Sequence, residues 1–457
     1  MKCAVFRGIG GCAYKYYMLF QHHLPPPVST YTTDAPQTMS ANSNDGVGVD
    51  PSQMKDTYVL QNEPEDSSYI IGSKPGPYVA EPSRSIYAKL GARIAFFGID
   101  ARTERTRHQV NYPETYELIF DRLKMELSSQ ADSGTPIQHM IVLLGIPIAY
   151  PRLTWLENIF SSPIMGPIKF LNKRVGFGGG FFNKFDGSVD LLDDLDDHYT
   201  ARTHKKERHN LIMRLQDLAA SYSIRVTILG GDVHLAALGR FYSNPKLGVP
   251  AASDHRYMAN VISSAIVNKP PPQAVANLLA RRNKLHHLDE NTDETLLKLF
   301  DKDPGKEAKT SSSNRVTMPS RNWAMITENS PPSSGSVSVA VSGGQIVEED
   351  RPDTNTSHLT SSTIKTMSTA SGKDGHHPLH VGEESAGTGS RAADDRQHGL
   401  SDDGSLDIMI RVERDQHDKE GRTTNYGLYV PTLKYEGATF MQKRHAKRGA
   451  MAAKTTG

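Results

Sequence analysis

Three short apolar runs alternate with two amphipathic segments between residues 93 and 234. The runs RIAFFGID (93–100), HMIVLLGIP (139–147) and VTILGGDVH (226–234) each adjoin Gly or Pro, which predicts buried strands. Between them, residues 114–128 and 200–222 repeat apolar side chains at helical spacing. The order strand, helix, strand, helix, strand predicts an α/β fold with helices packed on a mostly buried sheet.

The pattern is weaker on either side of this region. Residues 9–24 predict an apolar helix that ends before Pro25 and needs a partner to bury it. Residues 272–282 and 291–300 predict two more helices, and residues 322–327 a strand.

The C-terminal part combines a low-complexity stretch with two alternating segments. Residues 329–403 are rich in Ser, Thr, Gly, Asp and His, which indicates disorder. Apolar residues then alternate with polar ones from Leu406 to Val412 and from Tyr426 to Val430, which predicts two strands. We expect these strands to pair as a hairpin and to return to the main sheet. The low-complexity stretch would then be an insertion within one folded unit.

Composition sets limits on the class of protein. Apolar residues make up 37% of the chain, below the usual ~45–50%, so disordered segments dilute a folded part. With 52 Lys and Arg against 51 Asp and Glu, the formal charge is +1, and we expect no nucleic-acid partner. Cys3 and Cys12 make no disulfide framework, and Arg7 and Lys15 interrupt any signal peptide, so we expect a cytoplasmic protein. No apolar run approaches the ~18–20 residues that span a bilayer.

The sequence GGDVH at 230–234 carries the strongest chemical signal. The two glycines allow a sharp turn at the end of a predicted strand, where functional groups gather in α/β sheets. Asp232 and His234 then offer a carboxylate and an imidazole, which suit cations such as Mn, Fe or Zn. The structural alternative is an Asp-capped turn with a hydrogen-bonded histidine.

A second candidate follows another predicted strand. In FGIDART (97–103), Asp100 and Arg102 are placed to face the same edge of the sheet. The guanidinium group of arginine matches phosphate oxygens, which favours a phosphoester substrate. The alternative is a surface ion pair.

A third candidate is the Asp- and His-rich segment 185–212. His204 lies on the inward stripe of the predicted helix with Arg208 beside it, and we assign both to the catalytic group. Most of the aspartates before the helix are solvated capping charge. The spacing is not HExxH, and GFGGG at 176–180 lacks the Lys-Ser or Lys-Thr of a P-loop.

Together these segments resemble the PhoD-type phosphatase/phosphodiesterase family, with the closest likeness to its large fungal members. The likeness runs through RIAFFGIDART, HMIVLLGIPIAYPRLTWLE, DLDDHYTARTHKKERHNLI and ILGGDVHLAALGRF, and extends to FRGIGGCAYKYYMLFQHHL and TTNYGLYVPTLKY. The resemblance implies a layered α/β metallophosphatase sheet with flanking helices, and hydrolysis of phosphate mono- or diesters. It also implies a binuclear site for Fe, Ca, Mn or Zn with Asp232 and His234 among the ligands, and Asp100 and Arg102 near the substrate.

One departure from the family concerns the metal site. Its members carry further ligands in an early aspartate motif and a Trp-Asp-Asp-His-Asp-like segment, which lie before the region that Met1 begins. We therefore expect an N-terminally truncated domain with impaired activity, in which the strands at 93–99, 139–145 and 226–230 lack the early strands that would pair with them. The alternative is an inactive fragment or a binding module.

The expected organisation follows from these patterns. It comprises an N-terminal helix of the catalytic domain (1–27), a loop (28–68), the C-terminal part of a PhoD-like domain (69–328), a disordered insertion (329–403), a returning hairpin (404–435) and a basic disordered tail (436–457).

Overall fold

The computed structural model describes residues 4–27, 30, 66–151, 199–281, 283–310, 314–330 and 386–435. The expected loop up to residue 65, the acidic part of 185–198, most of the expected insertion (331–385) and the basic tail lie outside the described residues. The boundaries of the expected domain division stay a prediction.

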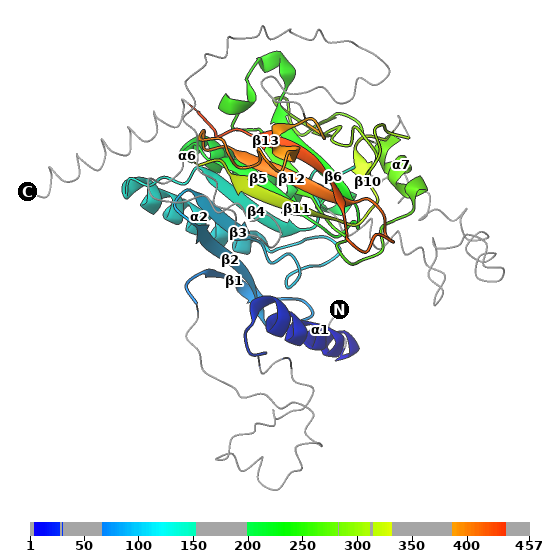
Figure 1. Ribbon diagram of the computed structural model, residues 1–457. Helices are drawn as coiled ribbons and strands as arrows, with labels where there is room; N and C mark the ends of the chain where they lie inside the picture. The colour runs from blue at the N-terminus through cyan, green and yellow to red at the C-terminus, as the bar shows by residue number, and fades with distance from the viewer. Residues whose placement is uncertain are drawn as a thin grey trace, which may run out of the picture.

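A mixed sheet forms the centre of the molecule (Figure 1). Among the described residues its ten strands run in the order β1-β2-β3-β4-β5-β7-β6-β9-β8, with β10 paired to β6. Their bounds are β1 Tyr69–Pro75, β2 Pro82–Leu90, β3 Ile94–Gly98, β4 His139–Gly145, β5 Arg225–Gly230, β6 Ala236–Ser243, β7 Met258–Ile262, β8 His286–His287, β9 Thr292–Leu296 and β10 Thr317–Met318.

The centre of this sheet is parallel. β3, β4, β5 and β7 are parallel neighbours, and the strands on either side of them are antiparallel. The first three are the strands that the apolar runs predict. The expectation that they would lack partners is wrong, because β3 pairs with β2 and β4, and β5 pairs with β4 and β7.

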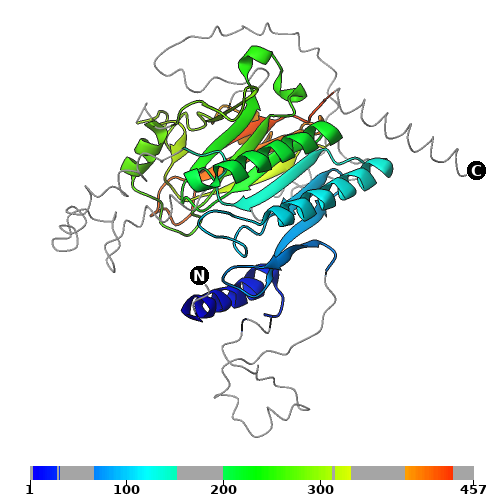
Figure 2. The ribbon, with the colours of Figure 1, turned by 180° about the vertical axis from the view of Figure 1, so that it is seen from behind.

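Two long helices cover one face of the sheet (Figure 2). They are α2 (Pro113–Asp132) and α6 (Lys205–Tyr222), which the short turn η5 (Arg202–His204) precedes. Their buried stripes include Ile119, Leu123, Leu211 and Leu215, and pack against buried side chains of β3, β4 and β5 such as Phe97. Helical spacing in the sequence therefore predicted both helices and the side of each that is buried.

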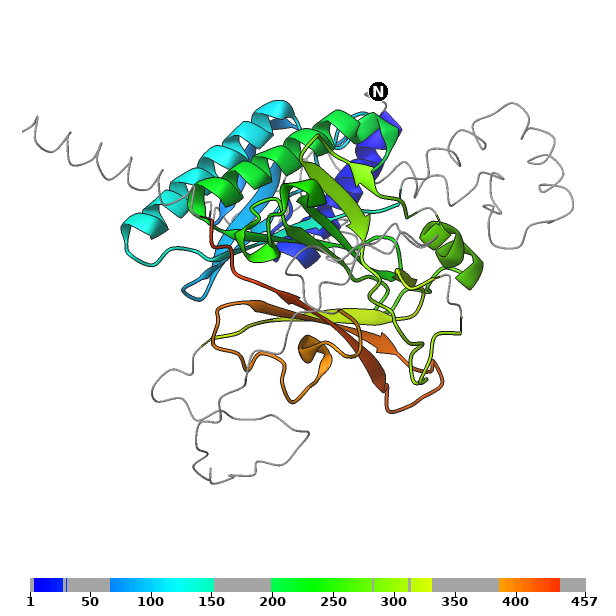
Figure 3. The ribbon, with the colours of Figure 1, turned by 90° about the horizontal axis from the view of Figure 1, so that it is seen from above.

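A second sheet covers the opposite face (Figure 3). It consists of β11 (Asn322–Glu328), β12 (Leu406–Glu413) and β13 (Thr423–Val430), in the order β11-β12-β13. β12 and β13 pair as the expected hairpin, but they do not return to the main sheet. Instead, alternate side chains from Leu406 to Val412 pack with Leu238 and Val261 of the main sheet, which makes a helix–sheet–sheet arrangement.

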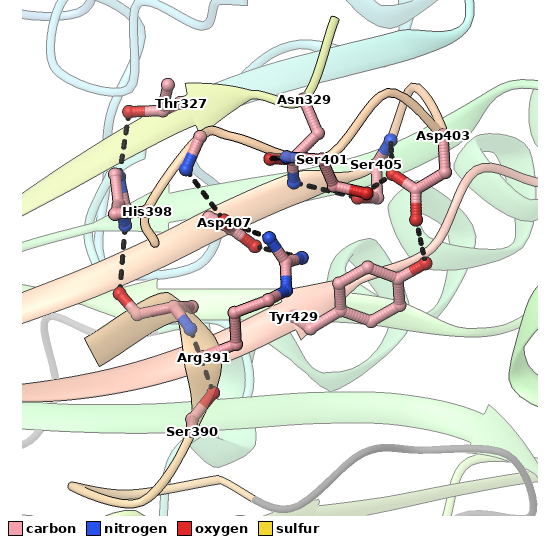
Figure 4. Close-up of polar contacts among 12 residues, drawn as sticks. Thr327, Asn329, Ser390, Arg391, His398, Ser401, Asp403, Ser405, Asp407 and Tyr429 are labelled. Atoms are coloured by element: carbon pink, nitrogen blue, oxygen red, sulfur yellow. Dashed lines mark hydrogen bonds and ion pairs between the residues drawn. The ribbon is translucent and has the colours of Figure 1, made fainter. Parts of the chain in front are cut away.

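Residues 386–403 cover the outer face of the small sheet (Figure 4). Arg391, in the turn η8 (Arg391–Ala393), forms a bidentate ion pair with Asp407 of β12 at 3.0 and 2.9 Å. His398 lies 2.8 Å from both the Thr327 hydroxyl and the Ala392 carbonyl oxygen. This part of the expected disordered insertion is therefore ordered, and it explains why Asp407 is buried although the alternation places it outward.

The remaining elements lie at the ends of the main sheet. They are α1 (Ala4–Tyr17), the π-helical turn η1 (Met18–His22), the short turns η6 (Pro245–Leu247) and η7 (Ala251–Ser253), and α7 (Gln273–Arg281). The helix expected at 9–24 is present and packs on the β1–β2 ribbon, where Arg84 donates a 2.7 Å hydrogen bond to the Tyr14 hydroxyl. Within the described ranges, no helix is long and apolar enough to cross a membrane.

The prediction of a helix at 291–300 is wrong. Residues Thr292–Leu296 form β9, which pairs with β6 and is buried along its whole length. In the sequence, Asp293 and Glu294 resemble the polar face of a helix. In the structure, Asp293 lies 2.6 Å from a ring nitrogen of His287, and Glu294 forms an ion pair with Arg208. Distant partners therefore allow charged residues in a buried strand.

Candidate functional site

Four loops meet at the carboxyl edge of the parallel strands. They follow β3, β4, β5 and β7, the position where α/β sheets collect ligand-binding groups. Two backbone hydrogen bonds join them, from Gly231 N to Gly145 O at 3.2 Å and from Ser263 N to Gly230 O at 3.2 Å. The strands therefore fix where each of these loops begins.

Arg102 and Asp232 face each other across two of these loops. A guanidinium nitrogen of Arg102 lies 3.6 Å from a carboxylate oxygen of Asp232, and their side chains are 53% and 32% exposed. A pair this open to water contributes little to stability. The structure thus brings together two residues that lie 130 positions apart and that the sequence placed at the same edge.

Asp100 does not share this exposure. Its two carboxylate oxygens accept hydrogen bonds from four donors in its own neighbourhood: the backbone nitrogens of Arg84, Arg102 and Thr103, and the Thr103 hydroxyl, at 2.6 to 3.0 Å. The side chain is buried. Asp100 therefore fixes the backbone that presents Arg102, and the catalytic role predicted for it stays a prediction.

The turn that carries Asp232 and His234 has an unusual backbone. Both residues have positive φ angles, 75° and 52°, and a bond from Val233 N to Gly231 O closes the turn. Residues with a β-carbon rarely occupy this left-handed region, which costs of order 1–3 kcal/mol. Such strain occurs where the surroundings impose it, often at functional sites.

The loop after β7 holds His234 at two points. The His234 backbone nitrogen donates to the Ser264 hydroxyl at 3.2 Å, and the Asn268 amide nitrogen lies 3.1 Å from His234 Nε2. The structure therefore fixes both the backbone and the ring of His234. No local pattern in the sequence points to Ser264 or Asn268, because both contacts join loops about 30 residues apart.

Arg208 lies on the buried side of the site. It forms an ion pair with Glu294 and donates a 2.7 Å hydrogen bond to the Ile148 carbonyl oxygen in the loop after β4. Asn260 supports the same loop by accepting a 3.0 Å bond from Ala149 N. Asn260 is a polar residue within the otherwise apolar strand β7. This polar position is the sequence signal that could have identified Asn260 as a supporting residue.

His204 belongs to a different buried group. It lies 3.6 Å from the carboxylate of Glu207, which also accepts hydrogen bonds from Val110 N, Asn111 N and the Tyr116 hydroxyl. Burial opposes ionisation of Glu207, but the hydrogen bonds outweigh it and lower its pKa. This group ties α6 to the loop that carries Arg102, so the predicted catalytic role of His204 also stays a prediction.

A cavity of about 830 Å³ lies beside this group rather than at the carboxyl edge. Arg202, Lys205 and Glu207 are among its lining residues, whereas Arg102, Asp232 and His234 are not. The evidence for the candidate site is therefore the set of contacts between its loops.

Asp232 and His234 fit part of a metal coordination shell. A carboxylate and an imidazole, both accessible on one turn, are ligands that transition metals accept. Within the described residues, no group of three or more His, Cys, Asp or Glu side chains is arranged to hold a metal ion. The two side chains would thus be two ligands of a larger set.

In the following, Arg102, Asp232 and His234 are called the carboxyl-edge site. Its three members come from the two loops that the sequence singled out. Asp100 lies behind it and holds the Arg102 backbone, whereas Arg208 of α6 and His204 of η5 make buried contacts. Ser264, Asn268, Asn260 and Glu207 are the supporting residues that only the structure revealed.

Comparison with known proteins identifies the family of this chain. The chain is 40% identical over 343 residues to the "Uncharacterized protein YGR266W" of Saccharomyces cerevisiae, a match that covers 71% of this chain. The match spans only 44% of the yeast protein's length. No solved structure matches the chain. The model of the family described as PhoD related phosphatase matches residues 84–169 and 167–353, more than half of the chain, so the chain belongs to this family.

Proposed function

We propose that the carboxyl-edge site hydrolyses phosphate mono- or diesters. The observation that carries the proposal is the exposed pair of Arg102 and Asp232, 3.6 Å apart at the ends of parallel strands. Membership of a phosphatase family supports a phosphoester substrate.

Arg102 supplies the phosphate contact in this proposal. Its guanidinium is half exposed and lies close to the Asp232 carboxylate. A phosphate can therefore accept hydrogen bonds from the guanidinium N–H groups, and no buried charge loses its partner. The same donors would stabilise the charge that builds up on phosphorus oxygens during hydrolysis. Asp100 supports this role because it accepts the Arg102 and Thr103 backbone N–H groups.

Asp232 and His234 are the proposed metal ligands of this chain. The family is typically metal dependent, and Fe, Ca, Mn and Zn are the candidate ions. A bound cation would supply Lewis-acid chemistry and a water with a lowered pKa. Ser264 holds the His234 backbone, and Asn268 lies against the ring at Nε2. For His234 to bind a metal through Nδ1, the Asn268 amide would turn its oxygen toward the Nε2–H group.

The test is turnover of p-nitrophenyl phosphate and bis-p-nitrophenyl phosphate by the 457-residue chain, after chelation and after addition of each candidate metal. We expect turnover that depends on metal and that falls at least ~10²-fold in Asp232→Asn. Asp394→Asn is a matched control, since Asp394 lies in the segment that covers the small sheet. Absence of turnover with every metal and both esters would favour a binding module instead.

We also propose a cytoplasmic location. It rests on Cys3 and Cys12, which make no disulfide framework, and imaging of a fluorescent fusion would test it.

A further inference from the structure

The loop after β7 exposes two neighbouring aliphatic side chains. Ile266 and Val267 are 67% and 81% exposed. Single exposed apolar residues are common and need no explanation. Two adjacent branched residues gain significance only if the structure holds them in place at a site, and two further observations show that it does.

The first observation is that the loop conformation is imposed. Ala265 has a φ of 72°, a left-handed backbone that a residue with a β-carbon adopts at a cost. Asn322 holds the base of the loop: its side-chain nitrogen donates to Ser264 O at 2.5 Å, and its side-chain oxygen accepts from the Ser263 hydroxyl at 2.9 Å and Ser264 N at 3.1 Å. The Asn322 backbone nitrogen donates to Ala265 O at 3.4 Å. Several hydrogen bonds therefore maintain the strained turn directly before Ile266.

The second observation is where the loop is anchored. Ser264 and Asn268 both contact His234, one through its backbone nitrogen and the other through its ring. Ile266 is two residues from each anchor, so its α-carbon lies within about 7 Å of both. The tip formed by Ile266 and Val267 therefore lies next to the two residues that contact His234 of the carboxyl-edge site.

We propose that Ile266 and Val267 form an apolar subsite for the ester group of the substrate, which makes the substrate a phosphoester of an apolar alcohol. This inference rests on the proposed function. In such a complex, Arg102 would contact the phosphate, and Ile266 and Val267 would contact the apolar ester group. A phosphorylated sugar would leave both side chains in water, whereas an alkyl or aryl group would cover them.

Burial of a methylene group against this tip sets the size of the expected effect. Full burial strengthens binding about fourfold per methylene, so partial burial gives roughly twofold. From a methyl to a hexyl ester, five added methylenes should therefore raise kcat/KM by at least about tenfold.

The experiment compares methyl and hexyl esters in two series, the alkyl monophosphates and the p-nitrophenyl alkyl phosphodiesters. We expect the full chain to prefer the hexyl ester about tenfold or more, and the Ile266→Ser/Val267→Ser variant to show a hexyl-to-methyl ratio near one. Both side chains are exposed, so the variant should keep its melting temperature, which is measured alongside. Leu400→Ser is the control, because Leu400 is 75% exposed in the segment over the small sheet.

A binding measurement separates this inference from the proposed function. Calorimetry with methylphosphonate and hexylphosphonate reports the subsite without turnover. If the chain hydrolyses no ester but binds hexylphosphonate more tightly, and the double variant loses that preference, the subsite stands and the proposed function fails. If the hexyl-to-methyl ratio is near one, or if the double variant keeps the preference, the apolar subsite is wrong whatever the activity.

Discussion

The two ends of the central parallel strands use charged residues in opposite ways. At the carboxyl end, Arg102 is half exposed and meets one carboxylate at 3.6 Å. At the amino end, Arg225 is fully buried and donates to the carbonyl oxygens of residues 251, 254, 257 and 431 at 2.5 to 2.9 Å. His139, its register partner on β4, is also buried and lies 2.7 Å from Gly404 O.

The difference suggests that the carboxyl ends of these strands serve ligand binding, whereas their amino ends serve stability. The donors of Arg225 join the main sheet to the loop after β6 and to the segment after β13, so they connect parts of the chain far apart in sequence. Arg102 has a side chain that water and a ligand can reach. We therefore expect changes at the amino end to affect unfolding, and changes at the carboxyl end to affect activity.

The largest expected effect is at Arg225. Burial lowers its pKa to about 10, and its substitution would leave several carbonyl oxygens without donors. We expect Arg225→Met to lower the free energy of unfolding by about 3–5 kcal/mol, because each buried carbonyl oxygen left without a donor costs about 1–3 kcal/mol. Urea unfolding followed by circular dichroism measures this. An unchanged midpoint would show that Arg225 does not stabilise the amino end.

The next effect is a pH dependence of stability from His139. Burial, opposed by the bond to Gly404 O, lowers its pKa from 6.5 to about 4. The unfolded chain therefore takes up the proton at higher pH than the folded one, so stability is complete above pH 6.5 and falls as the pH drops to about 4. For this shift the loss is about 3 kcal/mol.

Thermal melts between pH 7.5 and pH 4 measure this dependence in the wild type and in His139→Gln. The glutamine amide can donate to Gly404 O but does not titrate, so its curve should be flatter over this window. His255→Gln is the second variant to compare, because burial also lowers the pKa of His255 to about 4. Equal slopes in wild type and His139→Gln would contradict the assignment.

At the carboxyl end, Arg102→Met should reduce kcat/KM for the better ester substrate about 10²-fold and leave the melting temperature unchanged. The expected loss of activity comes from the phosphate contact, since an exposed pair adds little stability. Arg396→Met is the matched control, because the Arg396 side chain is 91% exposed in the segment that covers the small sheet. A fall in melting temperature that matches the loss of activity would assign Arg102 to the structural group instead.

The smallest expected effect is at Asn268. Asn268→Ala removes the contact with the His234 ring, and we expect roughly a tenfold loss of kcat/KM and of metal affinity, the lower end for residues that orient a metal ligand. Activity titrations with metal, together with melts, measure both. Gln416→Ala is an exposed amide control on the small sheet. If Asn268→Ala matches this control, His234 does not depend on Asn268.

Sequence patterns predicted those parts of the fold whose signal is local. The strands at 94–98, 139–145 and 225–230 and the helices α2 and α6 appear as continuous apolar runs or regular stripes. β9 was misread because its carboxylates have partners that the local pattern does not indicate: the buried Arg208 of α6, and His287 of the adjacent strand β8. The supporting residues Ser264 and Asn268 were missed for the same reason, since their roles depend on a loop that follows another strand.

The sequence by itself determined the α/β core, the two motif-bearing loops and the resemblance to a phosphatase family, because apolar periodicity and short motifs act within a few residues. Only the tertiary structure decided which strands flank the core, that β11, β12 and β13 form a separate sheet, and that Arg102 meets Asp232. It also decided that Asp100, His204 and Arg208 make buried contacts behind the site. These outcomes depend on pairing between distant segments, and local patterns do not specify which distant segments will meet.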